Sequence, residues 1–280
     1  MTPLTLSGST AGPPQTFPAL LDLLEARPQP ALIWYGAGQG EERVELSGRV
    51  LQNWTVKLIG LFDQESEIEA DDAVLIHAAA HWKAAAVLLA AGALGWKISV
   101  IDPGAPQSDQ EGLAAAVTAQ QPGLVVTERP GDWTGSGTWG QLLGDAELAA
   151  LSPGLLDASF EEATGQRLPA WALDISAEVR QHPDQLPAPL PPRELSEVPV
   201  PEGARSELGT AAGRGGGLVV VGASPQAPLQ DWGLTHWGAP DLLPQMLETW
   251  AQSRPVVLFP GDPTAQPQTW EQMLRNEAVR

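Results

Sequence analysis

The sequence predicts an α/β fold with mostly parallel sheets flanked by helices, and three consecutive segments carry this prediction. A short apolar run at residues 73–76 is bounded by turn residues, which is typical of a strand covered on both faces. An alanine-rich helical segment follows at Trp82–Leu94, and a second strand at Lys97–Ile101 ends in Asp102-Pro103. Strands that alternate with helices of this length indicate βαβ units and a mostly parallel sheet.

The segments before this unit are shorter and are separated by turns. Residues 17–26 fit a short helix, and residues 31–35 and 42–46 fit two strands around a glycine-rich turn. Ser47 is placed to cap the next helix, because its hydroxyl can accept a hydrogen bond from the first helical turn. Apolar residues then recur at helical spacing through about residue 62.

The segments after the unit repeat the same alternation less regularly. We expect a helix at residues 110–120, a strand at Leu124–Thr127, and loops with some helix from 128 to 180. A buried strand is predicted at Leu218–Val221, a helix over 242–250, a strand at 255–259 and a last helix around 270–274.

These segments divide the chain into four predicted parts. Residues 1–16 have no periodic apolar pattern and are predicted to be disordered, and residues 17–182 form a first α/β half. A proline-rich stretch at 183–206 is predicted to be an exposed linker or surface crossing, because proline removes backbone donors. Residues 207–280 form a second α/β half.

Composition excludes several classes of partner and chemistry. The 280 residues carry 34 acidic and 15 basic side chains, a formal net charge of -19. Such a field repels nucleic acid and anionic lipid. There is no cysteine and there are only four histidines, so we expect no disulfide and no metal site.

Targeting signals are not recognisable in the sequence. The first residues have no basic start followed by an apolar segment, so we expect no signal peptide. The longest apolar run, residues 84–96, is shorter than the roughly 18 residues that span a bilayer. We therefore expect a soluble, cytoplasmic protein that does not associate with membranes.

With these elements in place, the chain resembles the N-terminal portion of the AMP-binding, adenylate-forming enzymes, which are similar to acyl-CoA synthetases. The resemblance covers residues 31–127 and rests on seven residues in the family's order: Asp72, Val74, Trp82, Ala91, Gly95, Asp102 and Pro103. A weaker match covers residues 231–260, where THWGAP precedes a leucine-rich helix and PVVLF. The whole chain also resembles a short actinobacterial family of unassigned function built on that portion.

The resemblance implies a reaction in which a carboxylate and ATP give an acyl-adenylate, followed by thioester formation. The family's phosphate loop is rich in Ser, Thr and Gly and ends in Pro-Lys-Gly, which this sequence lacks. The nearest segment offers Thr134, Ser136, Gly137 and Thr138, but Trp139 and acidic neighbours oppose a phosphate, so we interpret it as a surface turn. The glycine-rich residues 209–217 precede a strand rather than a helix, and we interpret them as a loop.

Other residues that the family needs are missing as well. The single tyrosine, Tyr35, lies far from the position of the family's Tyr/Thr-Glu motif, and the last 100 residues contain no lysine for a catalytic cap. The chain also ends near the point where the family's second half would begin. We predict no catalytic residue.

The remaining candidates are weak. His77 and His81 are four residues apart but have no carboxylate ligand placed beside them, so we interpret the pair as structural. His236 and Trp237 align with the family's acyl-pocket wall and are our candidates for substrate binding. Most of the eleven tryptophans fall on apolar helical stripes and are predicted to be core residues.

Two hypotheses follow for the function. The first is a truncated, non-catalytic domain that binds a ligand or a protein and needs no cofactor. The second is an acyl-adenylate or acyl-CoA-forming ligase completed by a partner chain, which alone would require ATP and Mg²⁺. In both cases the expected partners are another protein or a second copy of the chain, not nucleic acid or a membrane.

Overall fold

The computed structural model describes residues 12–36, 42–104, 114–115, 117–152, 154, 157–186, 188–199, 215–222 and 228–279. Residues 1–11 of the predicted disordered N-terminus lie outside the described residues, as do residues 110–113 and 116 of the helix predicted at 110–120, residues 200–206 of the predicted linker and residues 207–214 of the second half.

One sheet is built from a single continuous part of the chain. Its strand order is β4-β3-β5-β6-β7, and all of its neighbouring strands pair in parallel. The strands are β3 (Ala73–His77), β4 (Lys97–Ile101), β5 (Leu124–Thr127), β6 (Glu147–Ala150) and β7 (Leu173–Asp174). The three predicted strands are confirmed, including their parallel pairing. The two strands that sequence analysis missed are short, with four and two residues, so they contain too little alternation to recognise.

The other sheet combines the two ends of the described chain. Its order is β2-β1-β10-β8-β9, and only β1 and β2 pair in antiparallel fashion. The strands are β1 (Pro30–Tyr35), β2 (Arg43–Ser47), β8 (Leu218–Val221), β9 (Gly233–His236) and β10 (Val256–Phe259). The sequence indicated all of these strands except β9.

The two sheets do not separate at the proline-rich stretch. β1 and β2 come from the predicted first half, yet they pair with strands of the predicted second half. The division at residues 183–206 stays a prediction, and the sheet β2-β1-β10-β8-β9 draws strands from both of the predicted halves. Parallel pairing of β1 with β10 buries both strands, and no local pattern encodes that contact.

The proline-rich stretch crosses the surface in irregular conformation. All of its described residues are exposed or half-exposed. They are irregular apart from one short turn of 3₁₀ helix at Leu195–Glu197. The stretch is nevertheless attached to the start of the first helix, because Thr16 forms a β-bridge with Glu194 and the Phe17 N–H donates to the Arg193 carbonyl over 3.0 Å.

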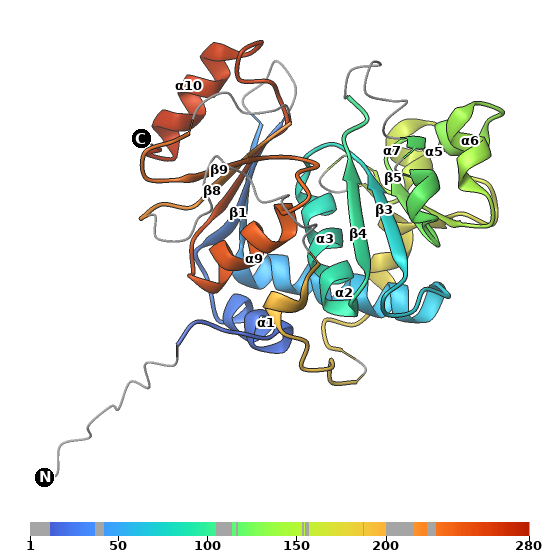
Figure 1. The fold of residues 1–280 in the computed structure, drawn as a ribbon, viewed down its shortest axis with the longest axis horizontal. Helices are drawn as coiled ribbons and strands as arrows, with labels where there is room; N and C mark the ends of the chain where they lie inside the picture. The colour runs from blue at the N-terminus through green and yellow to red at the C-terminus, as the bar shows by residue number, and fades with distance from the viewer. Residues whose placement is uncertain are drawn as a thin grey trace, which may run out of the picture.

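Helices flank the sheets (Figure 1). They are α1 (Phe17–Glu25), α2 (Gly48–Glu65), α3 (Trp82–Leu94), α5 (Pro130–Thr134), α6 (Thr138–Leu143), α7 (Phe160–Thr164), α8 (Ile175–Glu178), α9 (Leu242–Ala251) and α10 (Pro267–Asn276). The predicted cap of α2 is confirmed, since the Ser47 hydroxyl accepts from the Val50 N–H over 3.3 Å. Among the described residues, no helix combines the length and the apolar character that a membrane crossing requires.

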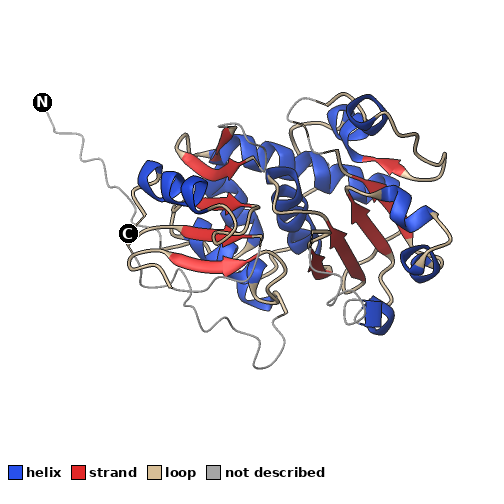
Figure 2. Ribbon diagram, turned by 90° about the horizontal axis from the view of Figure 1, so that it is seen from above, coloured by secondary structure: helices blue, strands red, loops and turns tan. Residues whose placement is uncertain are grey.

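Helix α3 lies between the two sheets, with α2 and α9 beside it (Figures 1 and 2). Nearly all of its residues are buried around the whole circumference, which explains why its sequence has almost no polar face. Gly92 is the point of closest approach, because a Cβ there would lie 2.9 Å from Leu243 of α9 and 3.0 Å from Phe17 of α1.

Indole side chains join the two sheets around the start of α3. Trp237, directly after β9, donates from Nε1 to the Ala78 carbonyl over 2.6 Å. Trp34 in β1 donates from Nε1 to the Ala80 carbonyl over 3.0 Å, and its ring packs edge-on against His81. The segment between β3 and α3 is therefore held from the opposite sheet.

Candidate functional site

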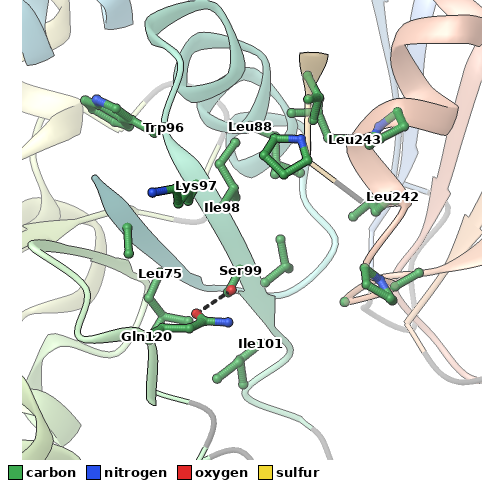
Figure 3. A pocket seen from close by; sticks show the side chains of 18 of the residues that line it. Leu75, Leu88, Trp96, Lys97, Ile98, Ser99, Ile101, Gln120, Leu242 and Leu243 are labelled. Carbon is green, nitrogen blue, oxygen red and sulfur yellow. Dashed lines mark hydrogen bonds between the residues drawn. The ribbon is translucent and has the colours of Figure 1, made fainter. Parts of the chain in front are cut away.

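A groove runs along strand β4, at the edge of the described part of the first sheet (Figure 3). Its volume is about 470 Å³. Besides β4 it is lined by Leu88 of α3, by residues 238–240, by Leu242 and Leu243 at the start of α9, and by Val198 and Pro199. We call it the β4 groove.

The groove reaches both faces of the sheet around the β4 edge. Leu242 and Leu243 lie across from one side of β4, and Leu75 and Gln120 lie on the other side (Figure 3). Ile98 and Val100 pack with the main core, whereas Ile101 belongs to the smaller cluster on the opposite face. This division follows the alternation of side chains along a strand.

The edge of β4 carries backbone groups that do not point toward β3. The Lys97 N–H donates to the Asp72 carbonyl over 2.8 Å, which fixes Lys97, Ser99 and Ile101 as the residues bonded to β3. Ile98 and Val100 therefore direct their N–H and C=O groups toward the groove. In the described sheet no strand pairs with this edge.

A turn after β9 closes one end of the groove. Gly238 has a φ of 97°, a left-handed conformation that favours glycine, and a Cβ there would lie 3.3 Å from the Val100 carbonyl oxygen. Close approach of the two backbones thus sets the width of the groove at this end.

Polar groups are few in the groove. Lys97 is exposed at one end of β4, and the Ser99 hydroxyl donates to the Gln120 side chain. Among the described lining residues, Lys97 is the one charged side chain, and most of the others are apolar. The groove is therefore suited to an apolar ligand with one anionic or polar group that contacts Lys97.

The predicted substrate-binding residues lie next to this groove but do not line it. Trp237 is buried, and its indole N–H donates to the Ala78 carbonyl, so this side chain links the two sheets. His236 is half-buried, and its Nδ1 is 3.3 Å from the Trp237 carbonyl oxygen. They immediately precede residues 238–240, which form the wall of the groove, and substrate contact by either side chain stays a prediction.

The predicted phosphate-loop candidates lie elsewhere, beyond the end of β5. Thr134 ends α5, Ser136 and Gly137 form a short connection, and Thr138 begins α6; all four are exposed. Trp139 turns inward and stacks on Trp133 and His77, with ring centroids 5.1 and 5.4 Å away. The arrangement is compatible with a surface turn anchored by an aromatic cluster, and the role of the four residues stays a prediction.

His77 is the centre of that aromatic cluster. The buried Trp133 donates from its Nε1 to His77 Nδ1 over 3.0 Å, and Thr127 Oγ1 lies 3.1 Å from the same nitrogen. An indole N–H can only donate, so Nδ1 must be an acceptor and the imidazole must be neutral. Burial, with a smaller contribution from the charge of Arg129, lowers the pKa of His77 to about 4.

His81 does not share a helix face with His77. It is the N-cap of α3, and its Nδ1 accepts from the Lys83 N–H over 3.1 Å. The two histidines thus belong to different local structures, one at a strand end and one at a helix start.

Lys83 is a buried cation that sequence analysis did not single out. Its Nζ donates to the Ser152 carbonyl over 2.9 Å and to the Ser152 hydroxyl over 3.1 Å, and Asp157 lies 3.6 Å away. Burial lowers the pKa of Lys83 to about 8, although Asp157 opposes that shift. A lysine inside an apolar helical run was the available signal, but its partners come from residues about 70 positions away.

Asp102, directly after β4, and Glu128, directly after β5, have pKa values above the usual range for a carboxyl group. Burial is the main cause that raises the pKa of both Asp102 and Glu128, and the charge of Arg129 opposes both shifts. Among the described residues, no group of three or more potential ligands is placed to hold a metal ion.

Comparisons with known proteins found one curated relative and many similar structures. No protein-family model matches the chain. A protein of Mycobacterium tuberculosis named "TIGR03089 family protein" is 31% identical over 216 residues, which cover 76% of each chain.

The similar solved structures include acyl-CoA synthetases. An acyl-CoA synthetase of Brucella canis superposes on 95% of the chain with a TM-score of 0.60 at 16% identity, and the chain covers 47% of it. The N-terminal subdomain of Klebsiella oxytoca NpsA, bound to 3-hydroxybenzoyl-AMSN, has a TM-score of 0.52 at 12% identity, with 92% of this chain and 58% of that one covered. The likeness shows the fold. The chain spans 47% and 58% of the lengths of these two structures, and between 38% and 60% of other solved structures with the same fold.

Proposed function

The chain belongs to the TIGR03089 family, and from this premise we propose that it is a non-catalytic member of the adenylate-forming fold. In this proposal it binds a ligand or a protein segment in the β4 groove. It needs no cofactor for this role.

The observation that carries the proposal is the chemistry of the groove. The groove is open and apolar, and Lys97 is the one charged group among its described lining residues. A nucleoside triphosphate requires several donors together with a cation, as phosphate-binding loops provide. An apolar acid or an apolar peptide requires only a hydrophobic wall and one or two polar contacts, which the groove supplies.

The sequence supports the same proposal. No Pro-Lys-Gly follows the Ser/Thr/Gly-rich segment, and no lysine occurs in the last 100 residues. The net charge of -19 further opposes the binding of a tetra-anion, although salt screens that field beyond about 8 Å. For the same reason we propose that the partner is a protein or a second copy of the chain rather than nucleic acid or a membrane surface.

A second function is favoured by one specific observation. The chain spans only 38% to 60% of the solved structures that share its fold. A partner chain that supplied the remainder would complete a ligase that forms acyl-adenylates or acyl-CoA. In that case ATP and Mg²⁺ would be required, and residues 134–140 of this chain would help to hold the phosphate groups.

Thermal unfolding with added ligands tests the proposal. A ligand at 100 times its Kd stabilises a protein by about 2.7 kcal/mol, or about 5 °C in Tm for a chain of this size. We expect no shift with Mg-ATP, AMP or coenzyme A, no pyrophosphate release with any acid, and a shift with decanoate. Lys97→Gln should reduce the decanoate shift and leave the Tm of the free protein unchanged, because Lys97 is exposed.

A different result would support the ligase. A Tm shift with Mg-ATP that disappears when residues 134–140 are replaced would contradict the non-catalytic role and would show that this segment binds phosphate.

A further inference from the structure

No strand in the described part of the chain pairs with the outer edge of β4, which gives the groove a chemistry that a simple apolar cavity lacks. We infer that the β4 groove binds an extended segment of a partner protein, which adds a strand to the sheet beside β4. This inference rests on the proposed binding function and specifies the kind of partner.

The backbone groups of β4 define the first requirement. Ile98 directs its N–H and C=O into the groove, and Val100 directs its N–H there, since Lys97, Ser99 and Ile101 are bonded to β3, while Gly238 lies against the Val100 carbonyl. An extended peptide offers donors and acceptors at the same repeat, which a fatty or aromatic acid does not. Proteins normally cover or charge such an edge, because it is a template for pairing.

The walls of the groove define the second requirement. Leu242 and Leu243 lie on one face of the sheet beside the edge, and Gln120 lies on the other (Figure 3). Val117 belongs to the hydrophobic cluster of Ile101 on the same face as Gln120. A strand placed next to β4 would send successive side chains alternately to these two faces. The lining therefore fits a residue pattern in which large apolar side chains face α9 and smaller or polar ones face Gln120.

The rim of the groove defines the charge of the partner. Asp71 and Asp72 are exposed just before β3, where the Lys97 N–H bonds to the Asp72 carbonyl, and Glu197 is exposed next to Val198 of the groove wall. The cations near this end of β4 are Lys97 and the half-buried Arg193, whose guanidinium lies against Gly95, so the three acidic side chains outnumber them. With a net charge of -19 on the whole chain, the partner segment should carry lysine or arginine near its ends.

The length of β4 sets the size of the segment. Gly238 closes the groove at Val100, so a partner strand can pair with β4 from Lys97 to Val100. Four residues of strand extend over about 13 Å, which leaves the ends of a seven-residue peptide outside the paired part.

A synthetic peptide tests the inference on the full chain. We would use a seven-residue peptide of alternating valine and threonine with lysine at both ends, and measure its Kd by calorimetry. Amide exchange followed by NMR should show slower exchange at Ile98 and Val100 with bound peptide, and unchanged exchange at Ser99. A peptide N-methylated at every interior residue should not bind, because it cannot pair as a strand.

Ile98→Pro is the matching variant of the protein. The Ile98 N–H faces the groove, so proline removes a donor toward the peptide without removing a bond to β3. We expect it to weaken peptide binding at least about tenfold. Ile98→Ala, which keeps the N–H and shortens the side chain, should weaken binding by less than about threefold.

Three results would overturn the inference. They are no binding of the peptide at 1 mM, equal binding by Ile98→Pro and Ile98→Ala, or a dimer in sedimentation that Ile98→Pro abolishes while the peptide does not bind. Decanoate binding without peptide binding would refute the added strand and leave the proposed ligand-binding function intact. The N-methylated peptide decides the matter on the unaltered protein if Ile98→Pro fails to fold.

Discussion

The two sheets of this protein reach similar burial by different routes along the chain. The sheet β4-β3-β5-β6-β7 uses strands that follow one another between residues 73 and 174. The sheet β2-β1-β10-β8-β9 joins strands from residues 30–47 to strands from residues 218–259. A strand can therefore be recognised from its local sequence, whereas the sheet that it joins depends on contacts between distant segments.

The sheets also differ in what lies at their ends. The first sheet carries the buried imidazole of His77 and the two carboxyl groups with raised pKa, Asp102 and Glu128. The second sheet contributes Trp34 and Trp237, whose indoles reach across to the segment between β3 and α3. Three changes test how far the two sheets depend on each other, and the expected loss in the free energy of unfolding decreases from the first to the third.

Acid should act mainly on the first sheet, through His77. Its folded-state pKa of about 4 lies below the usual 6.5, so the unfolded chain takes up the proton first. Stability is then complete above about pH 6.5 and is lost as the pH falls toward 4, by about 3 kcal/mol in total. Urea unfolding at several pH values measures this loss.

His77→Asn isolates that contribution, since the amide oxygen can still accept from Trp133 but does not titrate. Asp102 and Glu128 have raised pKa values and act in the opposite direction, because the folded protein takes up their protons more readily. We expect the variant to flatten the curve between pH 6.5 and 4. An unchanged slope would show that His77 is not the titrating group.

Bulk added to α3 should force the two sheets apart. Gly92→Leu places side-chain atoms where Leu243 and Phe17 already lie within 3.0 Å of a Cβ. Overpacking of this kind outweighs the gain in helix propensity, and we expect a loss of about 2 kcal/mol in the free energy of unfolding. Gly131→Ala is the control, because a Cβ at Gly131 of α5 has nothing within 4 Å. Equal stabilities of the two variants would contradict the packing of α3 against α9.

Loss of one indole bond between the sheets should have the smallest effect. Trp237→Phe removes the donor to the Ala78 carbonyl and should cost about 1 kcal/mol beyond the effect of the smaller ring. Trp82→Phe is the matched control, since the buried Trp82 Nε1 has no hydrogen-bond partner within the described chain. If the two variants lose the same stability in urea unfolding, the bond does not hold the sheets together.

Much of the candidate site lay beyond the reach of the sequence. His236 and Trp237 were singled out near the correct place, and the groove begins one residue later at Gly238. The groove itself depends on β4 being an edge strand, on the close approach of Gly238 to Val100, and on α9 reaching β4 from about 140 residues away. Lys83 escaped attention for a similar reason, because Ser152 and Asp157 meet it only in the folded chain.

Elements whose residues interact with their near neighbours could be predicted from the sequence. Apolar runs identified β3, β4, β5, β8 and β10, alanine-rich composition identified α3 as a helix, and Ser47 identified the start of α2. The strand order, the neutral state of His77 and the edge of β4 with which no described strand pairs follow only from the folded chain. These features arise from hydrogen bonds and burial between residues far apart in the chain, and the free energy of such contacts leaves no periodic trace in the local sequence.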